Sequence, residues 1–419
     1  MKSDRIIHVP RRFVSHEWGG TETVIGSLAL QQKKAGWCPE IHTSLALSTE
    51  RAGHWEGVPI RRYSYCYPFF GLSDAEKAQM DKKGGNLLSL PLFFSLARQR
   101  GVRLFHAHAL KRLGGAVFSA ARCSGRPFVV TLHGGVFDVP EAELSEMLEA
   151  QQGKMEWGKA FGALFRSRRI LQEADAVICV GRSEYDRARA SLGHDRIYHV
   201  GNGVEPEHFS SGDGEAFRHR HAIPAKATVL GCYSRLDPQK NQLLLLEAFD
   251  VLAARHPDLH LVLAGPETLP AYVQKIDARV QASPHRNRIR RLGPLSFGGG
   301  ELAGAYHACD VFVLPSRHEP FGIVVLEAWS AGRPVVVSAV GGLQHLVSDG
   351  VDGLFFPSGD VEACRARIET LLTDAALRER LGAAGRGKAT ESYSWSRIAQ
   401  ATEEIYQRAG EQQARRRSS

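Results

Sequence analysis

Short apolar segments alternate with longer helical patterns along this chain, and this alternation constrains the fold more than any other feature. Each apolar segment has the length of a strand, and several are followed by Gly, His or Asn and then by a helical stretch. Repetition of strand, turn and helix is typical of βαβ units around a parallel sheet. In the first half the predicted strands are Arg5–Pro10, Glu40–Thr43, Leu104–Ala107, Phe128–Leu132, Ala176–Val180 and Ile197–Val200.

The same alternation starts again in the second half, after the turn-rich segment Gly201–Pro224. A chain of 419 residues also exceeds what one hydrophobic core usually organises. We therefore predict an α/β protein with two Rossmann-like, doubly wound domains, residues 1–204 and 205–394. A helix over Trp395–Ala409 and a frayed tail over Gly410–Ser419 are expected to follow. The second set of predicted strands is Val229–Tyr233, His260–Ala264, Ile289–Leu292, Val311–Leu314, Val335–Ser338 and Leu354–Phe356, with a helix over Asn241–Arg255.

The net charge of the chain is +8, and it is unevenly distributed. Residues 1–200 hold 28 Lys and Arg against 20 Asp and Glu, whereas the remaining residues hold 25 of each. A basic first domain suits a nucleic acid, an anionic membrane surface or a phosphorylated partner, and it equally serves solubility alone. Because the sequence contains no helix-turn-helix, zinc or RNA-reading motif, no nucleic-acid partner is expected.

The seven cysteines are scattered singly, which predicts neither a zinc site nor a disulfide framework. Cys179, Cys232 and Cys309 lie in apolar runs and are predicted as small core residues. The N-terminus has no apolar signal region, and no run of 18 apolar residues occurs. We expect a cytoplasmic protein that does not span a membrane, and peripheral association with the inner membrane face stays open.

A glycine pair, Gly19-Gly20, follows the first predicted strand and opens a helical stretch. Without a Cβ the backbone can approach an anion closely, and the free amides at a helix start point toward such an anion. The segment Trp18-Gly19-Gly20-Thr21-Glu22-Thr23 therefore indicates either an anion site or a plain tight turn.

Two basic residues, Arg235 and Lys240, follow the strand Val229–Tyr233 in the segment Ser-Arg-Leu-Asp-Pro-Gln-Lys-Asn. They lie at the carboxyl end of a predicted parallel strand and ahead of a helix, where open α/β sheets bind their ligands. A guanidinium offers a planar fork to phosphate oxygens, and an ammonium offers a mobile point charge. A phosphate site is therefore favoured over a solvated surface pair.

Two acidic residues, Glu319 and Glu327, follow the strand Val311–Leu314, one in the loop and the other about two turns into a helix. Carboxylates accept hydrogen bonds from vicinal hydroxyls, which a hexose and a ribose both present. Burial of Glu327 in the apolar run Ile323–Trp329 is costly without a partner, and this favours a functional role over two exposed helical glutamates.

Together these motifs resemble glycosyltransferase family four, the retaining enzymes of the GT-B fold. The match covers nearly the full length, and its motifs occur in the family's order and spacing. They are Gly19-Gly20, Thr131-Leu132-His133-Gly134, Gly201-Asn202-Gly203-Val204, the Arg235 and Lys240 pair, and Glu319-Pro320-Phe321-Gly322 with Glu327. The resemblance implies two domains that face a central cleft, with a C-terminal helix of about residues 395–412 packed back on the first domain.

The resemblance also implies roles for single residues. Arg235 and Lys240 would hold the donor pyrophosphate and offset charge on the leaving phosphate. Glu319 would bind hydroxyls of the transferred sugar, and His133 matches a histidine that contacts this sugar. These four are the expected catalytic residues.

The other expected donor contacts come from both domains. Glu327 would hold the ribose, and the segment Arg290–Gly293 would face the base. The remaining donor-binding residues are Gly19 and Gly20 at the pyrophosphate, Phe321, Gly322 and Ile323 through their backbone amides, and Arg291 and Leu292 in the base-facing segment.

Acceptor contacts are assigned to three histidines. His106 and His108 end a predicted strand, and their spacing of two places both on one face. His16 lies close to the glycine pair. No third ligand for a metal is apparent, so no metal site is expected, and ordinary packing is the alternative for the first two histidines.

The predicted function is retaining transfer of a hexose-type sugar from a nucleotide diphosphate sugar to a glycan or lipid-linked acceptor, in polysaccharide or glycoconjugate biosynthesis. No cofactor is expected, because the family's enzymes work by positioning and charge stabilisation. The alternatives are a GT-B enzyme similar to a nucleotide-sugar 2-epimerase and, from another class, a basic nucleic-acid-binding protein.

Overall fold

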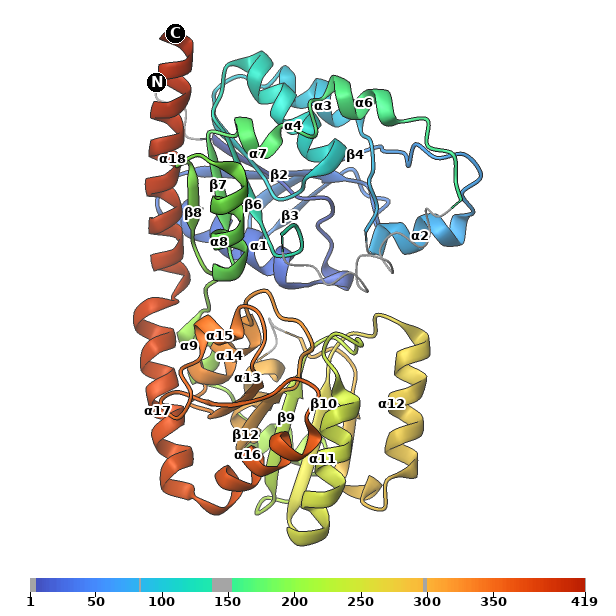
Figure 1. Ribbon diagram of the computed structural model, residues 1–419, viewed down its shortest axis with the longest axis vertical. Coiled ribbons are helices and arrows are strands. Elements are labelled where there is room, and N and C mark those ends of the chain that lie inside the picture. Colours follow the sequence, from blue (N-terminus) through green and yellow to red (C-terminus); the bar gives the residue numbers. More distant parts are fainter. Residues whose placement is uncertain (1–4, 83, 138–152, 297–299, 419) are drawn as a thin grey trace. The chain divides into compact units, whose positions relative to one another are not determined.

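The computed structural model describes residues 5–82, 84–137, 153–296 and 300–418, and it divides into two compact units. Unit 1 comprises Met1–Gly201 and Trp395–Ser419, and unit 2 comprises Asn202–Ser394. Each unit contains one largely parallel sheet with helices packed against it (Figure 1). The prediction of two doubly wound α/β sheets is therefore confirmed.

Unit 1 is built on an eight-stranded sheet in the order β3-β4-β2-β1-β5-β6-β7-β8. Strands β2, β4 and β3 lie on one side of β1, and β5 to β8 follow one another outward on the other side, which creates a topological switch point between β1 and β5. The strands are β1 (Arg5–Val9), β2 (Cys38–Ser44), β3 (Ala52–Trp55), β4 (Val58–Tyr63), β5 (Val102–Ala107), β6 (Phe128–Leu132), β7 (Ala176–Cys179) and β8 (Ile197–His199).

Helices cover both faces of this sheet, which explains why its inner strands β1, β5, β6 and β7 are buried along nearly their whole length. β6, for example, is buried at every position. The helices of unit 1 are α1 (Gly20–Lys34), α2 (Asp74–Lys82), α3 (Leu90–Ala97), α4 (Lys111–Ser124), α6 (Lys159–Leu164), α7 (Ile170–Glu173), α8 (Arg182–Leu192) and α18 (Trp395–Ser418), with a 3₁₀ turn η1 (Ser15–Glu17).

The structure contains an antiparallel hairpin of β3 and β4 at the sheet edge, which the sequence does not predict. Its turn consists of Glu56 and Gly57, both with positive φ (48° and 73°), as a two-residue hairpin turn requires. β3 is short and partly exposed, so it lacks the apolar run by which the other strands are recognised.

Unit 2 contains a six-stranded parallel sheet in the order β11-β10-β9-β12-β13-β14, with a switch point between β9 and β12. Its strands are β9 (Thr228–Tyr233), β10 (Leu259–Ala264), β11 (Ile289–Leu292), β12 (Val311–Leu314), β13 (Val335–Ser338) and β14 (Leu354–Phe356). Its helices are α9 (Pro206–Ser210), α10 (Gly214–Arg220), α11 (Gln242–Arg255), α12 (Pro270–Ala282), α13 (Glu301–Ala308), α14 (Ile323–Ser330), α15 (Leu343–Leu346), α16 (Val361–Thr373) and α17 (Ala375–Ser392), with a 3₁₀ turn η3 (Arg286–Arg288).

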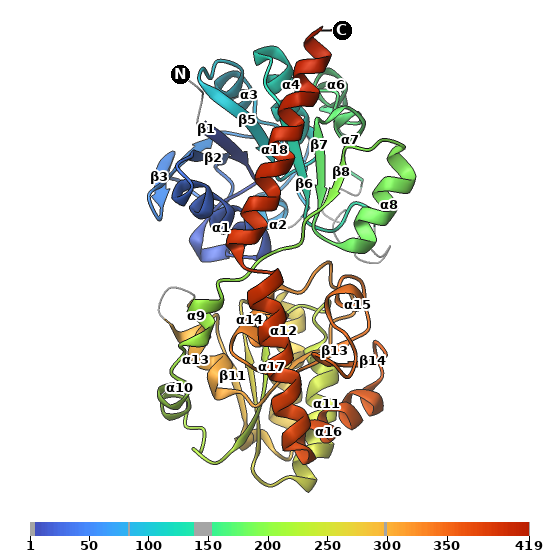
Figure 2. The same cartoon turned by 90° about the vertical axis from the view of Figure 1, so that its left-hand side faces the viewer.

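The C-terminal helix α18 packs on the sheet of unit 1, where it lies beside α1 (Figure 2). The expectation of a frayed tail over Gly410–Ser419 is wrong, because the helix continues to Ser418. One reason is a contact near its end, where the Gln413 side-chain amide donates a hydrogen bond to the carbonyl of Gly125 (2.8 Å).

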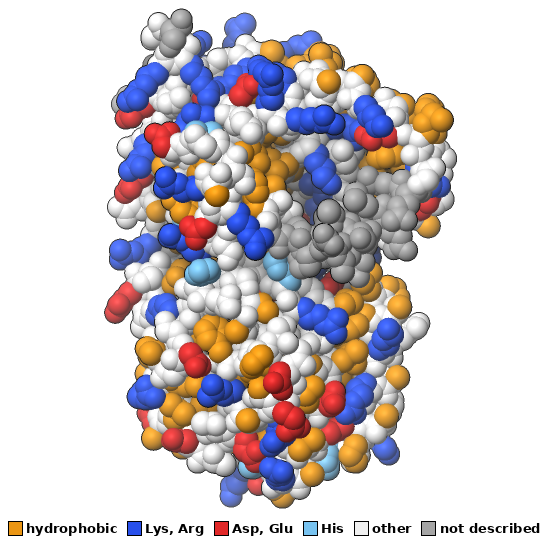
Figure 3. Space-filling view, viewed as in Figure 1, with side chains coloured by type: hydrophobic (Ala, Val, Ile, Leu, Met, Phe, Trp, Pro, Cys, Tyr) orange, Lys and Arg blue, Asp and Glu red, His pale blue; other side chains and the backbone are white. Residues whose placement is uncertain are grey.

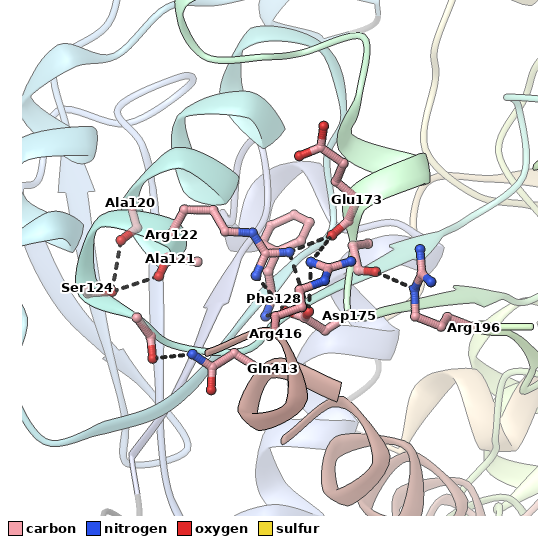
Figure 4. A network of polar contacts seen from close by, with 12 residues as sticks. Ala120, Ala121, Arg122, Ser124, Phe128, Glu173, Asp175, Arg196, Gln413 and Arg416 are labelled. Carbon is pink, nitrogen blue, oxygen red and sulfur yellow. Dashed lines mark hydrogen bonds and ion pairs between the residues drawn. The ribbon is translucent and has the colours of Figure 1, made fainter. Parts of the chain in front are cut away.

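A buried carboxylate, Asp175, holds the same end of α18 (Figure 4). It accepts from the backbone amide of Phe128 (2.9 Å) and pairs with Arg122 (3.0 Å) and Arg416 (3.1 Å). Both guanidiniums also donate to the carbonyl of Glu173. The last turns of α18 are thus fixed by side-chain contacts that a pattern of hydrophobic residues does not reveal.

The predicted core positions of Cys179, Cys232 and Cys309 are confirmed, since all three side chains are buried. Among the helices of the described residues, none combines the length and apolar character needed to cross a bilayer.

Candidate active site

The switch point of unit 2 brings together the charged loops that the sequence singles out. β9 and β12 are hydrogen-bonded neighbours that run in parallel. Arg235 and Lys240 follow the carboxyl end of β9, and Glu319 follows the carboxyl end of β12. All three therefore lie at the edge of the sheet where open α/β folds bind their ligands.

Local hydrogen bonds shape the loop after β9. The Asp237 carboxylate accepts from the amide of Gln239 (2.9 Å), and its carbonyl accepts from the amide of Lys240 (2.8 Å), which closes a tight turn. The buried side chain of Gln242 donates to the carbonyl of Arg235 (2.8 Å). These contacts fix the backbone from which Arg235 and Lys240 project.

Lys240 and Glu319 form a hydrogen-bonded ion pair in which both residues are more than nine-tenths buried. The Ser316 hydroxyl lies 3.5 Å from the same Glu319 oxygen. Burying two charges costs several kcal/mol each before their attraction is counted, so such a pair is a poor way to stabilise a fold. Its position at a switch point favours a role in binding a charged ligand.

Arg235 adds a positive charge that is not balanced nearby. Its guanidinium is half-buried and makes one long contact, 3.4 Å, to the side-chain oxygen of Gln239. It forms no ion pair with any described residue. The three side chains Arg235, Lys240 and Glu319 together carry one net positive charge, which suits an anion that presents several oxygens.

Glycines allow a second loop to approach Glu319 closely. The amide of Gly342 donates to the carbonyl of Glu319 (2.8 Å). A Cβ on Gly341 would lie 2.5 Å from that carbonyl, and a Cβ on Gly342 would lie 2.1 Å from the carbonyl of Pro320. The loop after β13 therefore fixes the backbone of Glu319 through positions that tolerate no side chain.

The three residues expected to bind through backbone amides lie at the start of α14. Gly322 precedes the helix with φ of 100°, a conformation that glycine adopts without strain. Ile323 is the first helical residue, and the ring of Phe321 packs edge-on against Tyr393 at 5.9 Å. The segment thus places a helix N-terminus beside Glu319.

Glu327 lies inside the same helix and is buried. Its carboxylate accepts a hydrogen bond from the Tyr306 hydroxyl (2.7 Å). Burial raises the pKa of Glu327 to about 7, and the Tyr306 hydrogen bond opposes that rise. Near neutral pH this side chain therefore exchanges between a carboxyl and a carboxylate.

The base-facing segment assigned by resemblance lies at the edge of the sheet, on β11. Arg291 forms ion pairs with Glu267 and with Asp277 (3.1 Å). Leu292 packs against the core of unit 2. The amide of Gly265 donates to the carbonyl of Gly293 (3.2 Å), which joins the ends of β10 and β11.

In unit 1 the glycine pair begins α1, as the sequence predicts. Gly19 is the N-cap and Gly20 is the first helical residue. The amide of Gly19 donates to the Glu22 carboxylate (3.2 Å), which also lies 3.5 Å from the guanidinium of Arg12. An anion at Gly19 would therefore replace the Glu22 carboxylate as the acceptor for this amide.

The four predicted histidines of unit 1 lie in different environments. His16 is exposed in η1. His106 and His108 are buried, with ring centroids 4.1 Å apart, which confirms that they share a face. His133 is half-buried after β6, and its Nε2 lies 3.0 Å from Nδ1 of His108. Of the three proposed acceptor residues, His16 alone is exposed in this structure.

The structure adds three polar side chains that the sequence interpretation misses. His8 on β1 lies 3.0 Å from His108, Gln32 on α1 lies 2.8 Å from His8, and Tyr406 on α18 lies 2.7 Å from His106. His8 pairs with His106 across β1 and β5, at the switch point of unit 1. A histidine inside the apolar run of β1 is the signal by which one of the three could have been found.

His8 also supplies the third histidine that is not apparent from the sequence. Within the described residues, nitrogen atoms of His8, His106 and His108 lie within 4.8 Å of one another, a spacing that could hold a metal. All six ring nitrogens, however, already have hydrogen-bond partners. A metal would have to break several of these bonds, and the absence of a metal site stays a prediction.

Comparison with known proteins places the chain in a family. The family described as "Glycosyl transferases group 1" matches residues 213–388, and that described as "Glycosyl transferase 4-like domain" matches residues 19–203. Two Rossmann-like units with these matches define the GT-B class of transferases. The chain belongs to the group 1 glycosyltransferases.

Relatives with assigned activities cover part of the chain. It is 34% identical over 252 residues to D-inositol 3-phosphate glycosyltransferase from Stackebrandtia nassauensis, a match to 57% of this chain and 55% of the relative. It is 30% identical over 300 residues to glycogen synthase from Mycobacterium tuberculosis, covering 68% and 69%. The chain thus spans between about half and two thirds of the length of these relatives.

Solved structures share the fold over nearly the whole chain. HepE from Anabaena in complex with UDP-glucose has a TM-score of 0.71 and 19% identity, with 96% of this chain and 98% of that chain covered. WaaG, a glycosyltransferase involved in lipopolysaccharide biosynthesis, has a TM-score of 0.67 and 16% identity, with 96% and 99% covered. The predicted GT-B fold is confirmed.

Replacement of Lys240 should weaken phosphate binding. In Lys240→Ala the charge-assisted contact is lost, which is worth about 1.5–3 kcal/mol, so the Kd for the preferred nucleoside diphosphate should rise roughly 10- to 160-fold. Calorimetric titration measures this change, with Lys226→Ala, an exposed lysine of the same unit, as the control. Equal affinities of wild type and Lys240→Ala would remove the phosphate role.

Glu327 should make stability depend on pH. Because the folded state holds its proton up to about pH 7, against an ordinary pKa of 4.5, this residue stabilises the fold fully below pH 4.5 and loses that contribution as the pH rises through 7. The loss amounts to about 3 kcal/mol. Urea unfolding of wild type and Glu327→Gln at pH 5 and pH 8 isolates this contribution. If the difference between the two proteins is the same at both pH values, the shifted pKa is wrong.

Proposed function

We propose that this chain is a retaining hexosyltransferase that moves a sugar from a nucleotide diphosphate donor to a glycan or lipid-linked acceptor. The main support is the buried Lys240 and Glu319 pair beside the unbalanced guanidinium of Arg235. A phosphate and a sugar hydroxyl are the two partners that such a set accommodates at once. The relatives named above are sugar transferases or synthases, which agrees with this assignment.

The proposed reaction breaks the bond between the anomeric carbon and the donor phosphate oxygen. A bond to the acceptor oxygen forms on the same face of the sugar, and the leaving diphosphate takes the acceptor proton. Arg235 and Lys240 stabilise the negative charge that builds on the leaving phosphate. Glu319 orients the sugar through its hydroxyls. These side chains supply the charge, so the proposal includes neither a cofactor nor a metal.

A panel of UDP-, GDP- and ADP-sugars tests this proposal by thermal shift. One donor at about 100 times its Kd should add roughly 2.7 kcal/mol of stability. When that donor reacts with extracts that contain the acceptor, the product should have the same anomeric configuration as the donor. A chelator should leave the rate of this reaction unchanged. If no nucleotide sugar stabilises the protein, the proposal fails. Release of free nucleotide without any acceptor would instead identify an enzyme similar to a 2-epimerase.

For the acceptor, we propose one displayed at an anionic membrane. A pocket of about 340 Å³ in unit 1 is lined by Arg122, Arg126, Arg416 and Arg417. Arg122 and Arg416 are paired with Asp175, whereas Arg417 is exposed and lies over Gly125. On the face drawn in Figure 3, Lys and Arg side chains are prominent over unit 1, whereas both signs of charge alternate over unit 2. Such a surface attracts anionic headgroups.

Flotation with vesicles tests the membrane proposal. The wild type should float with vesicles that contain about one third anionic phospholipid at moderate salt and not with neutral ones, because each arginine near the surface contributes about 1 kcal/mol. Arg126→Glu with Arg417→Glu should reduce flotation strongly, and Arg286→Glu, an exposed position of unit 2, should not. Wild-type protein that ignores anionic vesicles would exclude this acceptor class.

A further inference from the structure

A continuous chain of hydrogen bonds runs through the interior of unit 1 and ends at His133. From His133 Nε2 it passes to His108 Nδ1 (3.0 Å), and from His108 Nε2 to His8 Nδ1 (3.0 Å). His8 Nε2 then contacts the Gln32 side-chain oxygen (2.8 Å). These four side chains come from the segment after β6, from the end of β5, from β1 and from α1, so their contact is purely tertiary.

The chain continues beyond Gln32. The Gln32 amide nitrogen donates to the Tyr406 hydroxyl (3.2 Å), which lies 2.7 Å from His106 Nδ1. His106 Nε2 in turn lies 2.6 Å from the Thr131 hydroxyl. Gln32, Tyr406 and all three inner histidines are buried. The C-terminal helix therefore reaches the same network as the strand ends of the sheet.

The Gln32 amide gives this chain a direction. Its oxygen can only accept, so His8 must carry its proton on Nε2. A neutral imidazole has one N–H, so His8 Nδ1 is an acceptor and His108 must donate to it from Nε2. With its proton on Nε2, His108 has an acceptor at Nδ1, so His133 must donate to it from Nε2. His133 therefore carries its proton on Nε2, and its Nδ1 is unprotonated.

Burial keeps these rings neutral, and only a neutral imidazole has one N–H donor and one acceptor nitrogen. Burial lowers the pKa of His8 to about 4, with the Gln32 hydrogen bond opposing the shift, and it lowers the pKa of His133 to about 4. Burial and the neighbouring rings hold the pKa values of His106 and His108 well below the ordinary 6.5. At neutral pH each ring therefore exists as one of two tautomers, and its partners select which one.

Nδ1 of His133 is an end of the chain that has no hydrogen-bond partner among the described residues. No described residue donates a hydrogen bond to it, and the following residues are turned elsewhere, since the amides of Gly134 and Val136 donate to Glu184 (3.1 and 3.2 Å). His133 itself is only half-buried. The open nitrogen can therefore meet a ligand.

We propose that Gln32, acting through His8 and His108, is a positioning residue that holds His133 in the tautomer whose Nδ1 accepts a hydrogen bond from a ligand hydroxyl. The ligand class, a sugar, rests on the proposed function, whereas the tautomer rests on unit 1 alone. Without this chain of hydrogen bonds, which we call the relay, a fraction of the molecules would carry the His133 proton on Nδ1. In that fraction Nδ1 could not accept a hydrogen bond from the ligand hydroxyl.

Nitrogen-15 NMR of histidine-labelled full-length protein, free of ligand, tests the tautomer. The His133 ring should show a protonated Nε2 and an unprotonated Nδ1 at pH 7. A His133 with its proton on Nδ1, or an equal mixture, would overturn the proposal. So would uptake of one equivalent of Zn²⁺ with loss of the His8 and His108 signals, because the rings would then serve a metal.

Two variants separate the relay from general packing. Gln32→Met removes the amide at similar volume, so His133 should become a mixture of tautomers. Tyr406→Phe removes the hydroxyl on the other side of Gln32, so it should change His106 and leave His133 unaltered. Equal effects of both variants on His133, or no effect of Gln32→Met, would contradict a directed relay.

Ligand binding tests the recognition step separately. The donor that stabilises the protein most should shift the His133 Nδ1 resonance, and Gln32→Met should bind it roughly 2- to 12-fold more weakly, as expected for one hydrogen bond. A donor that binds without moving this resonance would overturn the hydroxyl contact. If no nucleotide sugar binds at all, the proposed function fails. The His133 tautomer measured without ligand still shows whether the relay exists.

Discussion

The geometry of the candidate site depends on the buried ion pair between Lys240 and Glu319. Two charges removed from water gain little net stability from each other, and apolar residues in place of such a pair often stabilise a fold equally well. We propose that they lie at a switch point because a ligand needs both a cation for its phosphate and an acceptor for its hydroxyls. The turn around Asp237 and the close approach of Gly341 and Gly342 serve to hold these two side chains.

Much of the fold can be predicted because parallel strands buried on both faces are short apolar runs, and β6 and β12 are clear examples. The hairpin of β3 and β4 escapes prediction because an edge strand has one exposed face and a short apolar pattern. The last turns of α18 escape it for another reason. Their order comes from Asp175, more than 200 residues away in sequence, and no local pattern contains that contact.

The placement of the residues proposed to bind the donor is largely predictable, since they follow two neighbouring strands, β9 and β12. The histidine network is not. His106 and His108 are visible as a pair, but their partners Gln32 and Tyr406 lie on helices whose facing surfaces only the tertiary fold brings together. Burial of both strand histidines also places them behind His133 rather than at the surface. Any effect of theirs on a ligand is therefore proposed to be indirect, through the ring of His133.

The most direct test of the donor site is a crystal structure of the full chain with a nucleoside diphosphate bound. The diphosphate oxygens should lie within hydrogen-bonding distance, about 2.7–3.2 Å, of both Lys240 Nζ and the Arg235 guanidinium. Glu319 should then be free to face the space that a sugar would occupy. A diphosphate bound elsewhere, with Lys240 still paired to Glu319 and Arg235 without a ligand contact, would contradict the assignment of this switch point as the donor site.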